Sequence, residues 1–289
     1  MRNLTRRSLL LATGAAAGWY GSNLFRADLP VLDGTKRLTD TTPPGMLNDA
    51  SGLSATPINR HITLNQPPDD SLIAALRAEM ASARTAGRAF NIGSARHSMG
   101  GQAIPRDGIA VTFDNGLIEP DSAAMTYRAH AGARWSQVIA ALDPLGFSPK
   151  VMQSNNDFGT AATFSVNAHG WPVPFGPMGS TVRAARMILP SGDLITASRT
   201  ENPEIFNLAM GGYGLVGAIV DLEVEMVPNT RLSPTFEVIP AEDFAAAFRK
   251  AVDDPAVTMA YGRLNVERAS FFRHALLITY REDADQTAL

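Results

Sequence analysis

One histidine lies among small residues in the segment Asn91–Gln102, which reads NIGSARHSMGGQ. Residues 89–92 (AFNI) before it predict a short buried strand, so the chain turns at Gly93–Ala95. Bare backbone N–H groups in such a turn can bind the oxygens of a diphosphate, and the ring of His97 then points at the ligand. A lone histidine is more often a hydrogen-bonded turn or core residue. The interpretation of this segment therefore depends on the segments that accompany it.

A second segment, residues 151–170, reads VMQSNNDFGTAATFSVNAHG and combines small with polar residues. The small residues at 159–163 permit close approach of a bound molecule. Ser165, Asn167 and His169 alternate with apolar residues, and an extended chain would place all three on one face. Such a polar line can follow the edge of a ring system or its phosphates. The alternative is a polar loop that satisfies its own backbone.

A third segment, Gly212–Gly217, matches the G-x-G-x-x-G pattern of dinucleotide-binding loops. In those loops a strand precedes the glycines and a helix follows, so that the pyrophosphate meets the helix N-terminus. Here the predicted helix, residues 204–210, comes first and the predicted strand, residues 219–226, comes second. The reversed order argues against a nicotinamide dinucleotide site, and a tight glycine corner that serves packing alone is the simplest alternative.

The elements that would position these segments alternate without a regular repeat. Apolar residues at helical spacing predict a helix over 72–83, after Asp69 and Asp70. Further strands are expected at 109–113 and 127–131, a helix at 135–142 and a hairpin at 186–197. This mixture favours an α+β fold over a doubly wound sheet. From about residue 233 the pattern changes to a helix at 244–252 and strands at 259–266 and 275–280, which predicts the start of another domain.

The three segments, in this order, resemble those of the FAD-binding PCMH-type flavoproteins. This is the vanillyl-alcohol oxidase/p-cresol methylhydroxylase family, which includes sugar-alcohol oxidases, aldonolactone oxidases and cytokinin dehydrogenases. In many members a histidine before a serine, as in His97-Ser98, is bonded to the flavin 8α-methyl group. Residues 159–170 are similar to the family passage TVGGxLSxNxHG, although Ala161 and Ala162 replace two glycines and Gly159 replaces a threonine.

The resemblance implies a cofactor, FAD, either bound without a covalent bond or tethered through His97. A cysteinyl flavin bond is excluded because the chain has no cysteine. The residues expected to contact the cofactor are Asn91, Gly93, Ser94, Ala95, Arg96, His97, Ser98, Gln102, Gly159, Ser165, Asn167, His169, Gly170, Gly217 and Ile219.

The implied activity is removal of a hydride from a CH–OH or CH–NH substrate such as a polyol, sugar or lactone, with reoxidation of the flavin by oxygen or another acceptor. Asp157 lies roughly where cytokinin dehydrogenases carry a catalytic aspartate, so it is the candidate base. Its alternative is an exposed loop carboxylate. Two other functions stay open: a flavin-binding protein without independent turnover, and a nicotinamide-dependent dehydrogenase that uses the Gly212–Gly217 segment.

The resemblance also predicts the domain organisation. A two-subdomain PCMH-type FAD-binding domain is expected over 63–230, after a linker at 31–62 that is rich in Pro, Gly, Thr and Asp. Residues 231–289 would form the start of an α+β cap, or substrate, domain. Because relatives usually continue much further, the sequence is expected to be a fragment, a truncated product or a reduced family member.

The N-terminal residues 1–30 resemble a twin-arginine export signal. Arg6 and Arg7 precede a short apolar run, and Ala15–Ala17 offers a cleavage site of small residues. A periplasmic or membrane-attached protein is therefore expected, the alternatives being an uncleaved anchor or a merely basic N-terminus. The net charge of −3 and the absence of internal Lys/Arg blocks argue against binding to nucleic acid. The missing cysteines also exclude disulfides, thiolate metal sites and cysteine nucleophiles.

Overall fold

The structure is a computed structural model that describes residues 42–98, 100–173 and 175–287. The predicted export signal, residues 1–30, and residues 31–41 of the predicted linker lie outside the described residues. Among the helices that are described, none combines the length and apolar character needed to cross a membrane.

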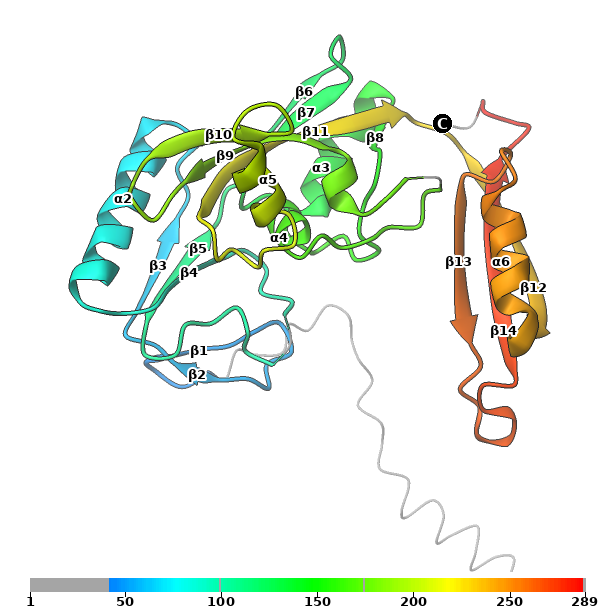
Figure 1. Ribbon diagram of the computed structural model, residues 1–289, viewed down its shortest axis with the longest axis horizontal. Coiled ribbons are helices and arrows are strands. Elements are labelled where there is room, and N and C mark those ends of the chain that lie inside the picture. Colours follow the sequence, from blue (N-terminus) through cyan, green and yellow to red (C-terminus); the bar gives the residue numbers. More distant parts are fainter. Residues whose placement is uncertain (1–41, 99, 174, 288–289) are drawn as a thin grey trace, which may run out of the picture. The chain divides into compact units, whose positions relative to one another are not determined.

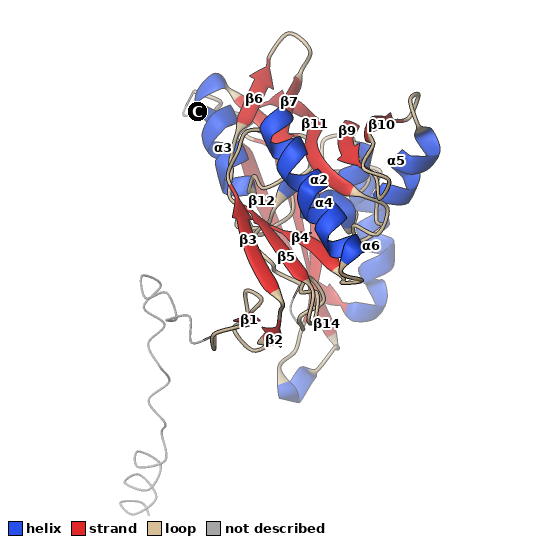
Figure 2. Ribbon diagram, turned by 90° about the vertical axis from the view of Figure 1, so that its left-hand side faces the viewer, coloured by secondary structure: helices blue, strands red, loops and turns tan. Residues whose placement is uncertain are grey.

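The first subdomain, residues 60–113, is a parallel three-stranded sheet covered by one helix. Its strands lie in the order β3-β5-β4, side by side in Figure 2. Helix α2 connects β3 to β4 and buries Leu72, Ile73, Leu76 and Ala83, as its helical spacing predicts. Asp69 begins the helix by accepting a hydrogen bond from Ser71 N. The bounds are β3 (Arg60–Leu64), α2 (Asp70–Thr85), β4 (Phe90–Gly93) and β5 (Ile109–Phe113).

A short antiparallel pair precedes this sheet within the predicted linker. Its strands are β1 (Met46–Leu47) and β2 (Thr56–Pro57). Asn59 N and Arg60 N, which follow β2, donate to the carbonyl of Gly108 at 2.9 and 3.3 Å. The described part of the linker is therefore a structured entry to the first sheet.

The second subdomain, residues 118–228, is built on an antiparallel sheet in the order β10-β9-β11-β7-β6, with β8 paired to β11 (Figure 1). Its strands are β6 (Ile118–Asp121), β7 (Thr126–His130), β8 (Phe147–Pro149), β9 (Val182–Ile188), β10 (Leu194–Ser198) and β11 (Ala218–Pro228). Its helices are α3 (Trp135–Leu142), α4 (Thr160–Ser165) and α5 (Pro203–Ala209). Apolar side chains of both subdomains, from Leu72 of α2 to Leu222 of β11, share one buried cluster, so the two subdomains pack as one core.

The segment 160–165 is a helix followed by a turn, so residues 165–169 do not form the extended chain that the sequence suggested. Ala161 and Ala162 favour helix formation, and the hydroxyl of Thr163 donates to Gly159 O at 2.8 Å. Asn167 then adopts a left-handed backbone with φ of 46°. Ser165, Asn167 and His169 consequently do not share one face of a strand.

The glycine corner at 212–217 has the predicted order. Helix α5 precedes it and strand β11 follows it, the reverse of a dinucleotide-binding loop. A Cβ at Gly217 would lie 2.7 Å from the carbonyl oxygen of Ile188, so this position needs glycine for backbone packing. The corner thus holds α5, β9 and β11 close together.

A C-terminal layer, residues 232–282, forms a separate antiparallel sheet in the order β12-β14-β13. Its elements are β12 (Leu232–Pro240), α6 (Phe244–Val252), β13 (Met259–Leu264) and β14 (His274–Glu282), coloured orange to red in Figure 1. Phe244 and Phe248 of α6 pack on Ile239 and Leu277. Helix α6 has the predicted bounds. Strand β13 ends two residues before its predicted end, and β14 begins one residue earlier and ends two residues later than predicted.

Candidate cofactor-binding site

A cavity of about 760 Å³ lies where the two subdomains meet. Its volume is within the range of pockets that bind cofactors and other small molecules. The first subdomain contributes α2, β4 and the loop that follows β4. The second contributes α4, the β9–β10 turn and the glycine corner. The wall is mainly apolar, with a few polar side chains.

Residues from all three predicted segments converge on this cavity. Eight residues of the predicted set line it: Asn91, Gly93, Ser94, Ser98, Gln102, Ser165, Gly217 and Ile219. The first two segments also touch each other, because a Cβ at Gly159 would lie 3.2 Å from Ser94 Cβ. The hydroxyl of Ser94 donates to Gly132 O at 2.8 Å and so ties the loop to the second subdomain.

Arg96 supports the loop from the side of the sheet. Its guanidinium donates to Thr112 Oγ1 at 2.7 Å and to Val111 O at 3.0 Å, both on β5. Burial lowers the pKa of Arg96 to about 10, which leaves the side chain charged at neutral pH. A Cβ at Gly93 would lie 3.0 Å from three side-chain atoms of Arg96. Position 93 therefore needs a residue without a side chain, because the Arg96 side chain lies against it. The buried positive charge of Arg96 also favours binding of an anion at the loop.

His97 faces a carboxylate instead of the cavity. Its Nε2 lies 2.7 Å from Asp157 Oδ2, and its ring packs on Phe158 with 4.4 Å between the ring centroids. Asp157 Oδ1 accepts a hydrogen bond from Arg134. Among the described residues, no hydrogen bond engages Nδ1 of His97. That nitrogen is thus the one left for another partner.

The pKa of Asp157 is shifted below its ordinary value. Burial favours the protonated form, but the hydrogen bonds from His97 and Arg134 and the charge of Arg134 outweigh it. Asp157 is therefore ionised at neutral pH, and 48% of its side chain is exposed. An ionised carboxylate that already contacts a guanidinium and an imidazole is a weak base. Its geometry suits orienting His97 better than removing a substrate proton.

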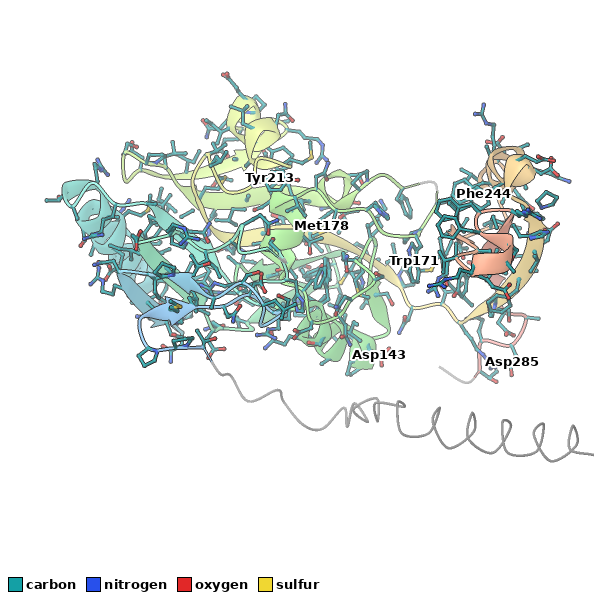
Figure 3. The ribbon with its side chains drawn as sticks, turned by 90° about the horizontal axis from the view of Figure 1, so that it is seen from below. Asp143, Trp171, Met178, Tyr213, Phe244 and Asp285 are labelled. Carbon is teal, nitrogen blue, oxygen red and sulfur yellow. The ribbon has the colours of Figure 1, made fainter. Side chains whose placement is uncertain are left out.

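Besides Arg96, His97 and Gly159, four residues predicted to contact the cofactor do not line the cavity. Asn167 Oδ1 accepts from Gly179 N at 2.9 Å, and Ala95 does not line the cavity. His169 and Gly170 line a second cavity of about 460 Å³, together with Trp171, Phe244 and Tyr261. Figure 3 labels Trp171 and Phe244. His169 and Gly170 lie at this second cavity because α4 and the turn at Asn167 redirect the chain, whereas the prediction assumed an extended chain.

Sequence reasoning missed much of the cavity wall. Residues of α2, β4, the β9–β10 turn and the glycine corner also line it, namely Met80, Ala83, Arg84, Arg88, Phe90, Pro190, Ser191, Tyr213, Gly214 and Leu215. The guanidinium of Arg84 donates to Pro190 O at 2.7 Å and so links α2 to the β9–β10 turn. Helical spacing assigned Met80 and Ala83 to the core. Tyr213 lies in the third predicted segment, but from that segment and the strand after it only Gly217 and Ile219 were predicted to contact the cofactor.

The residues of the site suit FAD. The loop after β4 offers backbone N–H groups and the hydroxyls of Ser94 and Ser98 to a diphosphate, and Arg96 supplies a positive charge behind them. Asn91 lines the cavity, and within the described part of the chain its buried Oδ1 has no hydrogen-bond partner. Buried polar atoms are normally paired, so this oxygen is consistent with a bound donor.

Comparison with known proteins agrees with this geometry. A family model described as FAD binding domain matches residues 72–198. Cytokinin dehydrogenase 8 of Oryza sativa subsp. indica is 28% identical over 222 residues, which cover 71% of this chain and 40% of that protein. The mitochondrial L-galactono-1,4-lactone dehydrogenase of Arabidopsis thaliana is 24% identical over 190 residues, which cover 65% of this chain and 31% of that protein.

A third relative, D-arabinono-1,4-lactone oxidase of Yarrowia lipolytica, is 30% identical over 112 residues, 39% of this chain and 21% of that protein. The matches thus span 40% or less of the length of these three relatives. Residues 72–198, which the family model matches, include most of the residues that line the cavity. The order of elements, the loop after β4 and these matches show that the chain is similar to the FAD-binding domains of flavoprotein oxidoreductases.

Proposed function

We propose that the chain holds FAD in the 760 Å³ cavity and oxidises a small molecule at a CH–OH or CH–NH carbon. The observation that carries the proposal is the convergence of three separate sequence segments on one cavity between the subdomains. When bound, FAD supplies a hydride acceptor at N5. The apolar walls would enclose its rings and exclude water, and the loop around Ser94 and Ser98 would hold its diphosphate.

A polyol, sugar or lactone is the proposed substrate class, and oxygen or another acceptor is the proposed oxidant. The names of the lactone-oxidising relatives support this class. We also propose that the C-terminal layer is a substrate-binding cap. Its second cavity begins at His169 and Gly170, which follow α4 in sequence, and Ser165 at the end of α4 lines the main cavity.

Covalent attachment through His97 is a further part of the proposal. Asp157 holds Nε2, so Nδ1 is the nitrogen that would bond to the cofactor. The test is acid precipitation of the purified flavoprotein. Flavin should stay in the pellet of the wild type and move to the supernatant with His97→Ala. His274→Ala, which removes an exposed histidine of the C-terminal layer, is the control and should behave as the wild type.

Turnover is tested by anaerobic mixing of the flavin-loaded protein with polyols, sugars, aldonolactones and amines. Bleaching of the flavin by one of these classes supports an oxidoreductase, and the class identifies the donor. A loaded protein that no class reduces would instead favour flavin binding without independent turnover.

One observation favours that second candidate, a flavin-binding protein without independent turnover. Phe236 and Val238 on β12 are 63% and 71% exposed, and they form an apolar surface that another polypeptide could cover.

Export by the twin-arginine route is proposed from the sequence of residues 1–30 alone. Expression of the full chain, followed by fractionation, should place it in the periplasmic or membrane fraction. Arg6→Lys together with Arg7→Lys preserves the charge and should leave the protein in the cytoplasm. Equal distribution of the two proteins would contradict the proposal.

A further inference from the structure

Two adjacent glycines in the loop after β4 bind a carboxylate of the same chain. Gly100 N and Gly101 N donate to Asp49 Oδ2 at 2.8 and 2.9 Å. Both glycines have positive φ, 110° and 76°, which turns their successive N–H groups toward one oxygen. Converging backbone N–H groups of this kind form an anion-binding concavity. In this protein Asp49 is the anion.

Asp49 is itself firmly held. It is 5% exposed, and its Oδ1 accepts hydrogen bonds from the backbone N–H and the hydroxyl of Ser51. Burial favours protonation of Asp49, but the bonds from Ser51, Gly101 and Gly100 outweigh it and hold its pKa well below the ordinary value. The next residue, Ala50, donates its N–H to Arg96 O at 3.0 Å. The segment around Asp49 therefore contacts the loop on both sides of His97.

The glycine pair lies between two residues of the cavity wall. Ser98 precedes it and Gln102 follows it, and both line the 760 Å³ cavity. The N–H groups of Gly100 and Gly101 are occupied by Asp49, so a bound diphosphate has to use the earlier part of the loop. Asp49 lies outside residues 72–198, the part matched by the family model, and it is 51 residues away from Gly100 in sequence.

We infer that Asp49 is a positioning residue of the cofactor site, an internal carboxylate that fills the glycine pair and holds Ser98 and Gln102 in the cavity wall. This inference rests on the proposed binding of FAD in that cavity. Because the loop is fixed before a ligand arrives, binding does not have to order it, and pre-organisation of this kind raises affinity.

The role is tested first on the protein without bound flavin, by amide hydrogen exchange. The N–H groups of Gly100 and Gly101 should exchange much more slowly than that of Gly214, an exposed glycine whose N–H makes no hydrogen bond among the described residues. Asp49→Asn leaves one acceptor oxygen for the donors on both sides of the carboxylate, so it should reduce the protection of Gly100 and Gly101. Exchange of the two wild-type amides as fast as Gly214 overturns the inference without requiring any variant to fold.

The second arm measures FAD affinity by fluorescence titration in a His97→Ala background, which keeps binding reversible. Asp49→Asn should weaken FAD binding about tenfold, the equivalent of about 1.4 kcal/mol. Asp69→Asn is the matched control, since Asp69 accepts bonds from Ser71 at the start of α2, and it should leave FAD affinity unchanged.

A double-mutant cycle separates positioning from general loss of stability. If Asp49 acts through Gln102, Asp49→Asn should weaken FAD binding by less than about threefold in a protein that already carries Gln102→Ala. Additive effects of the two substitutions, or an equal loss with Asp69→Asn, contradict the inference. A parent protein that binds no FAD refutes the proposed function, and the exchange experiment still decides the role of Asp49.

Discussion

Filling the cavity with one side chain should block FAD binding and leave the fold intact. Ala162 lines the cavity from α4, and its side chain is exposed to the open space. Ala162→Trp therefore places a large ring where the cofactor would lie, without displacing any core residue. Substitutions at exposed positions usually change stability by less than about 0.5 kcal/mol. For a chain of this size that corresponds to a shift of about 2 °C or less in Tm.

The effect on binding should be much larger. Forcing a bulky group into space that a ligand needs costs about 1–3 kcal/mol when the surroundings adjust, and each 1.4 kcal/mol weakens binding about tenfold. Ala162→Trp should thus raise the Kd for FAD by about tenfold to a hundredfold. The assay is quenching of flavin fluorescence on titration with apoprotein, in the His97→Ala background that keeps binding reversible.

The control is Ala246→Trp, which introduces the same ring at an exposed alanine of α6, in the C-terminal layer. It should leave the Kd unchanged. Equal affinity of Ala162→Trp and the parent, at equal Tm, would refute the placement of FAD in this cavity. A large fall in Tm for Ala162→Trp would show that Ala162 does not face open space.

Three further predictions follow from the contacts around the site. Asp157→Asn should lower stability by only about 1 kcal/mol, since the contacts of Asp157 with His97 and Arg134 are partly exposed. It should still reduce the fraction of acid-stable flavin, and an unchanged fraction would contradict the role of Asp157 in orienting His97. Asp49 has a folded-state pKa below its ordinary value of 3.8, so its stabilising contribution is present above about pH 4 and is lost as the pH falls further. Urea unfolding as a function of pH should therefore show a shallower acid slope for Asp49→Asn than for the wild type, and identical slopes would exclude this contribution. Gly217→Ala should destabilise the protein by about 1–3 kcal/mol because its Cβ would lie 2.7 Å from Ile188 O. Gly176→Ala is the control, because a Cβ there would have Ser180 Cβ as its nearest neighbour, at 3.5 Å, and it should change Tm little. Comparable losses in both variants would show that crowding at Gly217 is not the cause.

The sequence predicted elements well where local pattern and burial agree. Helix α6 has the predicted bounds because its apolar residues recur at helical spacing and pack on the C-terminal sheet. The reversed order around Gly217 was also predicted, because α5 and β11 have clearly different periodicities. At these places the hydrophobic pattern alone specifies the type of element.

Prediction failed where a polar pattern fits two conformations. Alternation of Ser165, Asn167 and His169 suits a strand, but it suits the end of a short helix followed by a left-handed turn equally well. Ala161 and Ala162 favour the helix, and the hydroxyl of Thr163 donates to Gly159 O within it. Similarity to the family passage identified this segment as part of the site but did not specify its backbone.

Other features of the site depend on contacts between residues far apart in sequence. Arg96 was assigned to the cofactor because of its place in the loop, whereas its side chain turns to β5 and stabilises the loop from behind. Asp49 lies in the predicted linker, and no local pattern indicates that it binds Gly100 and Gly101. Pairings of this kind come from the tertiary fold and are not encoded in spacing.

The central claim is that this chain binds FAD between its two subdomains. The most direct measurement is the absorption spectrum of the chain, purified after expression with FAD available and compared with that of Ala162→Trp prepared in the same way. The account predicts a yellow wild-type protein with flavin and protein in equimolar amounts, and a variant with little flavin. A well-folded but colourless wild-type protein, or equal flavin content in both proteins, would contradict it.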